Sequence, residues 1–142
     1  MKIEYKTGNI IDCEEEFIAH GCNAQGVMGA GVAGLIRSTY PESYDYYRWI
    51  HYHGGLHVGQ TYSYLEKDKM IIHCITQYGY GRVGRYVDYN AVKSCMMQIS
   101  NMFPGMSVAM PKIGAGLGGG NWDKLEEIIE HTSEFQPVVY EL

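Results

Sequence analysis

Gly26-Val-Met-Gly-Ala-Gly31 and Gly114-Ala-Gly-Leu-Gly-Gly-Gly120 are two glycine-rich loops, each placed between a short apolar run and an expected helix. Glycine allows positive φ angles and lets the backbone come close to a ligand. The N–H groups at the start of a following helix point toward negative charge. Loops of this kind bind phosphates, and two of them about 90 residues apart can hold the two ends of a diphosphate.

The apolar pattern around the loops predicts six strands and four helices. The strands are expected at 2–6, 17–20, 61–65, 70–76, 107–110 and 138–140, and the helices at 29–40, 41–50, 88–102 and 122–132. Pro41 separates the first two helices, and Asp88 and Asn121 stand where the last two begin. This alternation favours a three-layer α/β/α domain around a mixed six-stranded sheet. Ligands of such sheets bind beyond the carboxyl ends of the strands, so both loops are expected at one edge.

The composition is typical of a globular protein. The chain has 142 residues, of which 46% are hydrophobic and 19% are charged, and we expect residues 1–142 to form a single domain. Its formal net charge of −5 argues against binding to extended nucleic acid, because such binding depends on Lys and Arg. A small anion held by backbone N–H groups is compatible with this charge.

Cysteine usage and the N-terminus indicate a cytoplasmic protein. The four cysteines are far apart and form no CxxC pair, which argues against a zinc site or a disulfide scaffold. His51, His53 and His57 lie close together but lack the nearby carboxylate or cysteine of a metal site. Residues 1–8 carry no signal-peptide pattern, and no apolar run reaches the roughly 20 residues of a membrane span. We therefore expect no metal, no other cofactor and no membrane association.

Common nucleotide-binding and hydrolase motifs do not match the loops. A P-loop ends in Gly-Lys-Ser/Thr, and neither loop contains Gly-Lys. Gly26-x-x-Gly29-x-Gly31 differs in order and spacing from the Gly-x-Gly-x-x-Gly dinucleotide fingerprint. The chain also has no Gly-x-Ser-x-Gly elbow. These mismatches argue against a nucleoside triphosphatase, a Rossmann-type dinucleotide enzyme and an ordinary serine hydrolase.

Four segments of the chain instead match one family as an ordered set. They are Thr7-Gly-Asn-Ile10, Ile18-Ala-His-Gly-Cys-Asn23, Gly26-Val-Met-Gly-Ala-Gly-Val-Ala33 and Met110-Pro-Lys-Ile-Gly-Ala-Gly-Leu117, the last followed by Trp122. Together they resemble a macrodomain, an ADP-ribose-binding module. The resemblance is closest to the branch that contains the ADP-ribose-1''-phosphate phosphatases and the ALC1-like terminal ADP-ribose glycohydrolases. It spans nearly the whole chain, and it implies ADP-ribose or ADP-ribose-1''-phosphate as the small-molecule partner of a monomer.

The resemblance also implies an ADP-ribose site that uses both loops. Asn9 stands where macrodomains usually carry an aspartate that accepts the adenine amino group, so its amide oxygen is the acceptor here. Asn23 matches a position that faces the distal ribose. The first loop is expected to hold the diphosphate, and the second to wrap the other phosphate and the distal ribose. The implied ligand-binding residues are Asn9, Ile10, Asn23, Gln25, Met28, Gly29, Ala30, Gly31, Val32, Lys112, Gly114, Ala115, Gly116, Leu117 and Gly118.

Two positions depart from the glycohydrolases of this branch. In those enzymes a lysine follows the Ile-Thr of the fourth strand and attacks the distal ribose, and an aspartate follows the Gly-x-Gly-Leu of the second loop. This chain has Gln77 and Gly118 at these positions. Glutamine cannot form the covalent adduct, and glycine supplies no acid or base. The sequence therefore favours phosphate-ester hydrolysis over deglycosylation by that covalent route.

The catalytic candidates are His20 and Asp88. His20 ends the second expected strand and titrates in the range that suits acid–base catalysis, with a hydrogen-bonded core histidine as the alternative. Asp88 is either a general base or a helix cap. Lys112 either neutralises phosphate or is simply solvated. Replacing His20 or Asp88 is expected to abolish turnover without abolishing binding.

Three functions remain open. The leading one is a phosphatase that converts ADP-ribose-1''-phosphate to ADP-ribose. The second is an ADP-ribosyl hydrolase that acts on modified macromolecules by a substrate-assisted route, and the third is a non-catalytic binder of ADP-ribose or a related nucleotide.

Arg82 and Arg85 are candidates to close over an anionic substrate, and the alternative is that they are solvated surface arginines.

Overall fold

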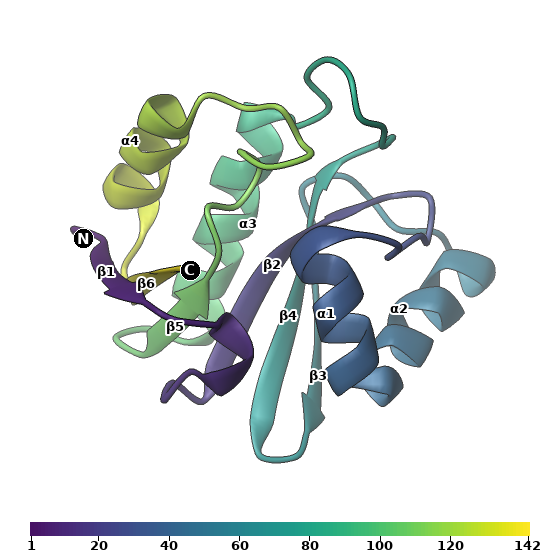
Figure 1. Ribbon diagram of the computed structural model, residues 1–142, viewed down its shortest axis with the longest axis horizontal. Helices are drawn as coiled ribbons and strands as arrows, with labels where there is room; N and C mark the ends of the chain where they lie inside the picture. Colours follow the sequence, from purple (N-terminus) through teal and green to yellow (C-terminus); the bar gives the residue numbers. More distant parts are fainter.

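A mixed six-stranded sheet forms the middle layer of the protein, and the computed structural model describes all of residues 1–142 (Figure 1). The strands are β1 (Glu4–Thr7), β2 (Phe17–Asn23), β3 (Thr61–Glu66), β4 (Lys69–Gln77), β5 (Ser107–Met110) and β6 (Gln136–Glu141). Across the sheet they lie in the order β1-β6-β5-β2-β4-β3, and β3 alone runs antiparallel to its neighbour. The mixed sheet expected from the sequence is confirmed.

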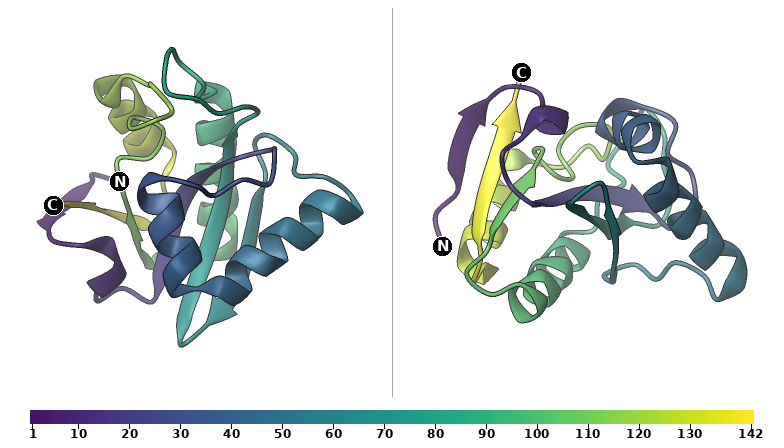
Figure 2. Two further views of the ribbon diagram at one scale, coloured as in Figure 1. Left: turned by 45° about the vertical axis from the view of Figure 1, so that its right-hand side comes forward. Right: turned by 90° about the horizontal axis from the view of Figure 1, so that it is seen from below.

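Two pairs of helices cover the two faces of this sheet (Figure 2). The helices are α1 (Gly31–Thr39) and α2 (Pro41–His53) on one face, and α3 (Tyr89–Met102) and α4 (Trp122–Thr132) on the other. Neighbouring residues of a strand point to opposite faces. Thus Ile71 packs in the core that contains Ile36 of α1, whereas Ile72 packs in the core that contains Ile99 of α3 and Leu125 of α4. None of the helices is long and apolar enough to cross a membrane.

Strand β2 extends beyond its apolar run. Its parallel pairing with β4 continues through Cys22, which lies opposite Ile75, and the register shifts between Cys22 and Asn23. Glycine and asparagine are uncommon in strands, so pairing with β4 rather than local preference carries β2 past His20. This extension brings Gly21 and Asn23 to the carboxyl edge of the sheet.

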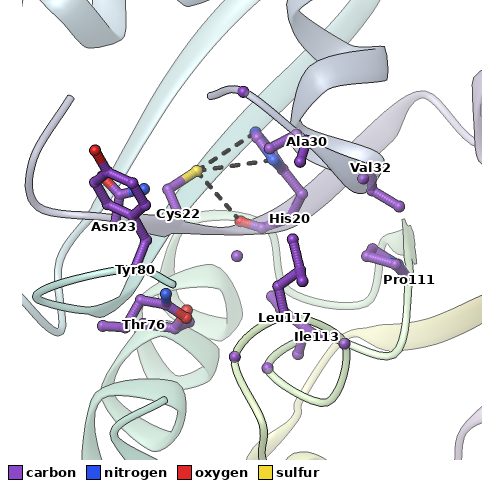
Figure 3. A pocket seen from close by; sticks show the side chains of 18 of the residues that line it. His20, Cys22, Asn23, Ala30, Val32, Thr76, Tyr80, Pro111, Ile113 and Leu117 are labelled. Carbon is purple, nitrogen blue, oxygen red and sulfur yellow. Dashed lines mark hydrogen bonds between the residues drawn. The ribbon is translucent and has the colours of Figure 1, made fainter. Parts of the chain in front are cut away.

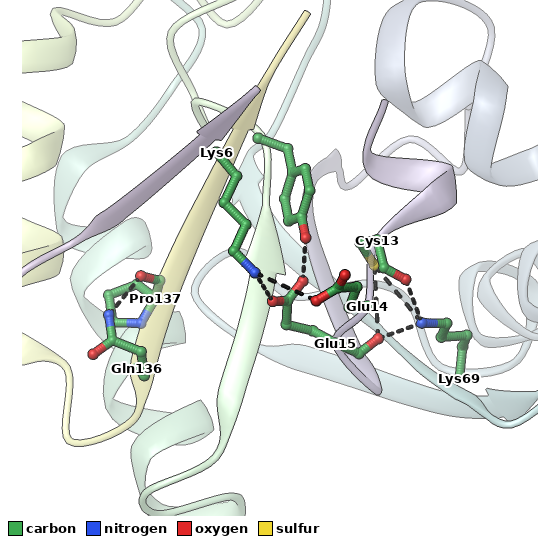
Figure 4. Close-up of polar contacts among 8 residues, drawn as sticks. Lys6, Cys13, Glu14, Glu15, Lys69, Gln136 and Pro137 are labelled. Carbon is green, nitrogen blue, oxygen red and sulfur yellow. Dashed lines mark hydrogen bonds and ion pairs between the residues drawn. The ribbon is translucent and has the colours of Figure 1, made fainter. Parts of the chain in front are cut away.

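Polar contacts fasten the segment before β2 to three other strands (Figure 4). The Glu15 carboxylate accepts hydrogen bonds from Lys6 Nζ at 3.0 Å and from the Tyr140 hydroxyl at 2.5 Å. Lys69, at the start of β4, donates from Nζ to the Cys13 carbonyl at 2.9 Å and to the Glu15 carbonyl. These bonds fix where β2 enters the sheet and so help to set the position of its other end.

Candidate functional site

A cleft opens at the carboxyl ends of β2, β4 and β5, between the two glycine loops (Figure 3). It encloses about 510 Å³, which is within the usual range for a small-molecule site. Its lining includes residues 27 and 29–33 at the first loop, 111–114 and 116–118 at the second loop and just before it, and the ends of β2 and β4. The expectation that both loops share one edge of the sheet is confirmed by this arrangement.

The first loop ends in a helix whose N-terminus has no side-chain cap. Ala30 occupies the N-cap position of α1, and the backbone N–H groups of Gly31, Val32 and Ala33 have no acceptor in the protein. Helices α3 and α4 differ, because Asp88 and Asn121 accept hydrogen bonds at their first turns. Unpaired N–H groups and the helix dipole make the start of α1 an anion-binding position.

Asn23 holds the first loop in shape. Its Oδ1 accepts hydrogen bonds from the backbone N–H of Gln25 at 3.0 Å and of Val27 at 3.3 Å, and its Nδ2 donates to the Val27 carbonyl at 2.8 Å. The Tyr47 hydroxyl donates to the Asn23 carbonyl at 2.6 Å. Asn23 lines the cleft, but its amide is already used to position the loop.

The second loop presents further unpaired N–H groups. Those of Gly114, Gly116, Leu117 and Gly118 have no acceptor in the protein. Gly114 has a φ of +80°, a conformation that favours glycine. The Gly118 carbonyl accepts from the N–H of Tyr86 at 2.7 Å and of Val87 at 3.0 Å, so the segment before α3 is tied to this loop.

Two cations border the cleft. Lys112 Nζ forms an ion pair with Glu141 at 2.7 Å and lies over the Trp122 ring, 5.8 Å from its centroid. Arg82 lines the cleft beside Tyr80 and forms no ion pair. Arg82 is therefore the cleft cation whose charge is not already compensated.

His20 belongs to a buried hydrogen-bonded chain. His73 Nε2 lies 3.0 Å from the Ser43 carbonyl, which can only accept, so this nitrogen carries the proton. In a neutral ring His73 Nδ1 is then the acceptor, and His20 Nε2 donates to it over 2.7 Å. His20 Nδ1 remains as an acceptor, 3.7 Å from Cys22 Sγ (Figure 3).

Burial keeps the hydrogen-bonded side chains of His20, His73 and Cys22 uncharged. It lowers the pKa of His20 well below its usual value, and the nearby His73 lowers it further. Burial also lowers the pKa of His73 to about 4, although the hydrogen bond to Ser43 opposes the shift, and it raises the pKa of the Cys22 thiol well above its usual value. These donors are of the kind that bind metals, but two nitrogens on one zinc ion would be roughly 3.3 Å apart, whereas 2.7 Å is a hydrogen-bond length.

The neutral histidine pair predicts a loss of stability in mild acid. Above about pH 6.5 both histidines are neutral in the folded and unfolded states, so they contribute nothing to the pH dependence of stability. Below it the unfolded chain takes up protons that the folded protein does not, so the free energy of unfolding falls by up to about 1.4 kcal/mol per pH unit for each histidine. Urea unfolding at pH 7, 6 and 5 measures how steeply the free energy of unfolding falls with pH. His73→Gln should reduce this slope by the contribution of one histidine, because one titrating group is removed. An unchanged slope in that variant would exclude His73 as its source.

A scan against family models matches the Macro domain over residues 19–129. The chain belongs to the macrodomain family. A 17.5 kDa protein of the tk-vs intergenic region of Enterobacteria phage T4 is 31% identical, with 98% of this chain and 96% of that protein covered. An ADP-ribose 1''-phosphate phosphatase of Candida albicans is 26% identical, with 87% and 85% covered. A DNA ADP-ribosyl glycohydrolase of Thermus aquaticus is also 26% identical, but this macrodomain spans 38% of its length.

Solved structures share the macrodomain fold. A protein of unknown function from Bacteroides thetaiotaomicron has a TM-score of 0.87 and 27% identity, with 100% of this chain and 99% of that chain covered. DarTG of Thermosipho africanus, solved in complex with ADP-ribose, has a TM-score of 0.82 and 18% identity, with 96% of this chain and 41% of that chain covered. The three-layer α/β/α architecture expected for a macrodomain is confirmed.

The structure brings most of the expected binding residues of the macrodomain to the cleft. Those that line it are Asn23, Gly29, Ala30, Gly31, Val32, Lys112, Gly114, Gly116, Leu117 and Gly118, and the catalytic candidate His20 lines it as well. His20 is 1% exposed, and its Nε2 proton is directed to His73. This geometry matches the core alternative given for His20, not a group that exchanges protons with a ligand.

Some of the expected residues lie outside the cleft lining. Asp88 is exposed and accepts from the Ala91 N–H at 3.1 Å as the cap of α3, which matches the helix-cap alternative given for it. Met28 is 1% exposed and packs in the core beneath α2, because the loop turns its side chain inward. Asn9 Oδ1 accepts from the Ile11 N–H at 3.1 Å and keeps a second lone pair for another donor. The other expected residues absent from the lining are Ile10, Gln25 and Ala115.

Several cleft residues are absent from the expected set. Gly21 and Thr76 lie on the adjacent strands β2 and β4, and Pro111 and Ile113 lie between β5 and the second loop. Tyr80 belongs to a segment rich in tyrosine and glycine. In the sequence, only the position of these residues marks them as cleft residues, because each lies at or just beyond the carboxyl end of a strand.

Proposed function

We propose that this macrodomain binds ADP-ribose, with the diphosphate held between the two glycine loops. The observation that carries the proposal is that unpaired backbone N–H groups of both loops surround one cleft. A diphosphate needs donors for its oxygens, and backbone N–H groups supply them without the Lys and Arg side chains that this chain has in small number. ADP-ribose or a derivative of it also appears in the names of the Candida phosphatase, the Thermus glycohydrolase and the DarTG complex.

We further propose that the protein hydrolyses ADP-ribose-1''-phosphate bound in this cleft. Water attacks phosphorus, the bond from phosphorus to the 1'' oxygen breaks, and ADP-ribose and inorganic phosphate leave. Arg82 and the unpaired N–H groups stabilise negative charge on the transferred phosphoryl group. The cleft lining contains no carboxylate, so the substrate's own phosphate oxygens accept a proton from the attacking water and pass it to the 1'' oxygen as the bond to phosphorus breaks.

Deglycosylation by a covalent route is a weaker fit to this cleft. Gln77 lines it, but its Nε2 donates to the Gly79 carbonyl at 2.8 Å, and an amide cannot attack a ribose. A side chain at position 118 would bring a Cβ within 2.6 Å of the Gly114 carbonyl oxygen. The local structure therefore leaves no room for an aspartate at that position.

Phosphate release from ADP-ribose-1''-phosphate, measured beside ADP-ribose affinity by calorimetry, tests the proposal. We expect release of phosphate, and Arg82→Ala should slow it by about tenfold or more because a charge-assisted contact is lost. Asp88→Asn is the control and should leave the rate of phosphate release unchanged, because asparagine also caps a helix and position 88 lies outside the cleft. Binding without phosphate release would reject the phosphatase, and release of ADP-ribose from modified DNA instead would favour the glycohydrolase.

A further inference from the structure

Helix α2 carries a stripe of exposed side chains along its outer side (Figure 2). Its members are three or four residues apart and therefore share one side of the helix: Glu42, Asp45, Trp49 and His53. Trp49 is 58% exposed, and Tyr52 beside it is 68% exposed. No residue of α2 lines the cleft, so ligand binding does not account for this exposed aromatic surface.

The aromatic side chains on and beside the stripe are held in fixed positions. The rings of Trp49 and His53 are stacked, with centroids 4.4 Å apart and an interplanar angle of 14°. His53 Nδ1 donates to the Trp49 carbonyl at 2.8 Å, and Arg48 Nη2 donates to the Tyr52 hydroxyl at 2.8 Å. Ordered rings lose little side-chain entropy when a partner covers them, and Trp, Tyr and Arg contribute most often to the binding energy of protein interfaces. This surface therefore suits contact with another protein.

The order of charges along α2 indicates which protein that is. The first half of the helix carries the carboxylates of Glu42 and Asp45, the second half carries Arg48 and His53, and none of these four forms an ion pair within the chain. When two copies of α2 pack antiparallel about Trp49, Asp45 of each copy faces His53 of the other, because both lie four residues from Trp49. Each acidic half then faces a basic half, and the two helix dipoles run in opposite directions. The stripe is thus self-complementary, as a two-fold contact requires.

We propose that α2 forms a two-fold interface with α2 of a second copy of this chain, with the two Trp49 side chains at its centre. A single pair of helices buries less surface than the interface of a permanent dimer, so the dimer forms at high protein concentration and dissociates on dilution. The monomer expected from the family resemblance is then the state at low concentration. Because no residue of α2 lines the cleft, both copies keep an open ligand site.

Sedimentation velocity over a wide range of protein concentrations tests the interface. We expect the average mass to rise with concentration from that of one chain toward that of two, and not beyond. Trp49→Ala should weaken dimerisation by at least about tenfold, because the central aromatic contact is lost. Asp45→Lys should also weaken it, since like charges then meet at both ends of the interface, and this loss should shrink when salt is added.

Two further variants separate this interface from non-specific association. Tyr78→Ala removes another exposed aromatic ring, 71% exposed and far from α2 in the sequence, and it should leave dimerisation unchanged. Asp45→Lys combined with His53→Glu exchanges the facing charges and should restore the dimer that Asp45→Lys weakens. Circular dichroism should show the same fold in each variant, because the replaced side chains are exposed. A protein that stays monomeric at the highest concentration, or Trp49→Ala that dimerises as the unmodified protein does, would overturn the proposal.

Discussion

Replacing Ala30 with aspartate should stabilise the protein and abolish its binding of ADP-ribose. Ala30 has the extended backbone of an N-cap, with φ −144° and ψ 165°, and the N–H groups of Val32 and Ala33 beyond it are unpaired. An aspartate there accepts from these groups and caps α1, which contributes about 1 kcal/mol to stability. The same carboxylate occupies the donors that the diphosphate needs and repels its charge, so we expect the dissociation constant to rise by at least about 100-fold.

Ala30→Asn separates the two effects. Asparagine caps the helix about as well as aspartate but carries no charge, so the melting temperature should rise similarly while affinity falls by only about tenfold. The additional loss in Ala30→Asp should shrink as salt is added, because exposed charges are screened. Thermal melts and calorimetry at two salt concentrations give both quantities. Undiminished ADP-ribose binding by Ala30→Asp would show that the start of α1 is not the phosphate site.

Replacing Gly118 with alanine should disrupt the second loop. The added Cβ would lie 2.6 Å from the Gly114 carbonyl oxygen and 3.0 Å from Gln77 Oε1, and the first of these is backbone that cannot rotate away. Gly118 also accepts through its carbonyl from Tyr86 and Val87, so a shift of the loop pulls on the segment that leads into α3. We expect a loss of about 2–3 kcal/mol in the free energy of unfolding, as for other overpacked sites, and a marked loss of ADP-ribose affinity.

Gly116→Ala is the control for this effect. It lies in the same loop, and a Cβ built on it meets no atom within 4 Å. Its free energy of unfolding should therefore stay within about 0.5 kcal/mol of the unmodified protein. Denaturant unfolding of both variants compares the two positions directly. Equal stability of Gly118→Ala and Gly116→Ala would mean that the second loop adjusts freely.

The layers of the fold follow directly from the sequence. The apolar runs that become β4, β5 and α4 are short and clearly bounded, and Pro41 marks the boundary between α1 and α2. The placement of both glycine loops at one edge follows from parallel strand order. These features depend on local pattern and on general rules for α/β sheets, which is why they can be anticipated without coordinates.

The details of the site depend on contacts between distant residues. His20 and His73 are far apart in the sequence and meet through the parallel register of β2 and β4. Met28 sits inside a glycine loop, where no periodic pattern shows which way a side chain turns. Thr76 Oγ1 is buried without a hydrogen-bond partner, and this depends on the three-dimensional packing around it. The loops and their edge of the sheet therefore follow from the sequence, whereas the hydrogen-bond partners of the residues around them depend on the folded chain.

Amide chemical shifts during a titration with ADP-ribose test the central claim most directly. If the two loops hold the diphosphate through backbone donors, the N–H resonances of Gly31, Val32 and Ala33 and those of Gly114 and Gly118 should move most. The first-turn resonances of Ala91 in α3 and Lys124 in α4, whose donors are already capped, should hardly change. A titration that leaves the loop resonances in place while others move, or that moves none, would contradict the account.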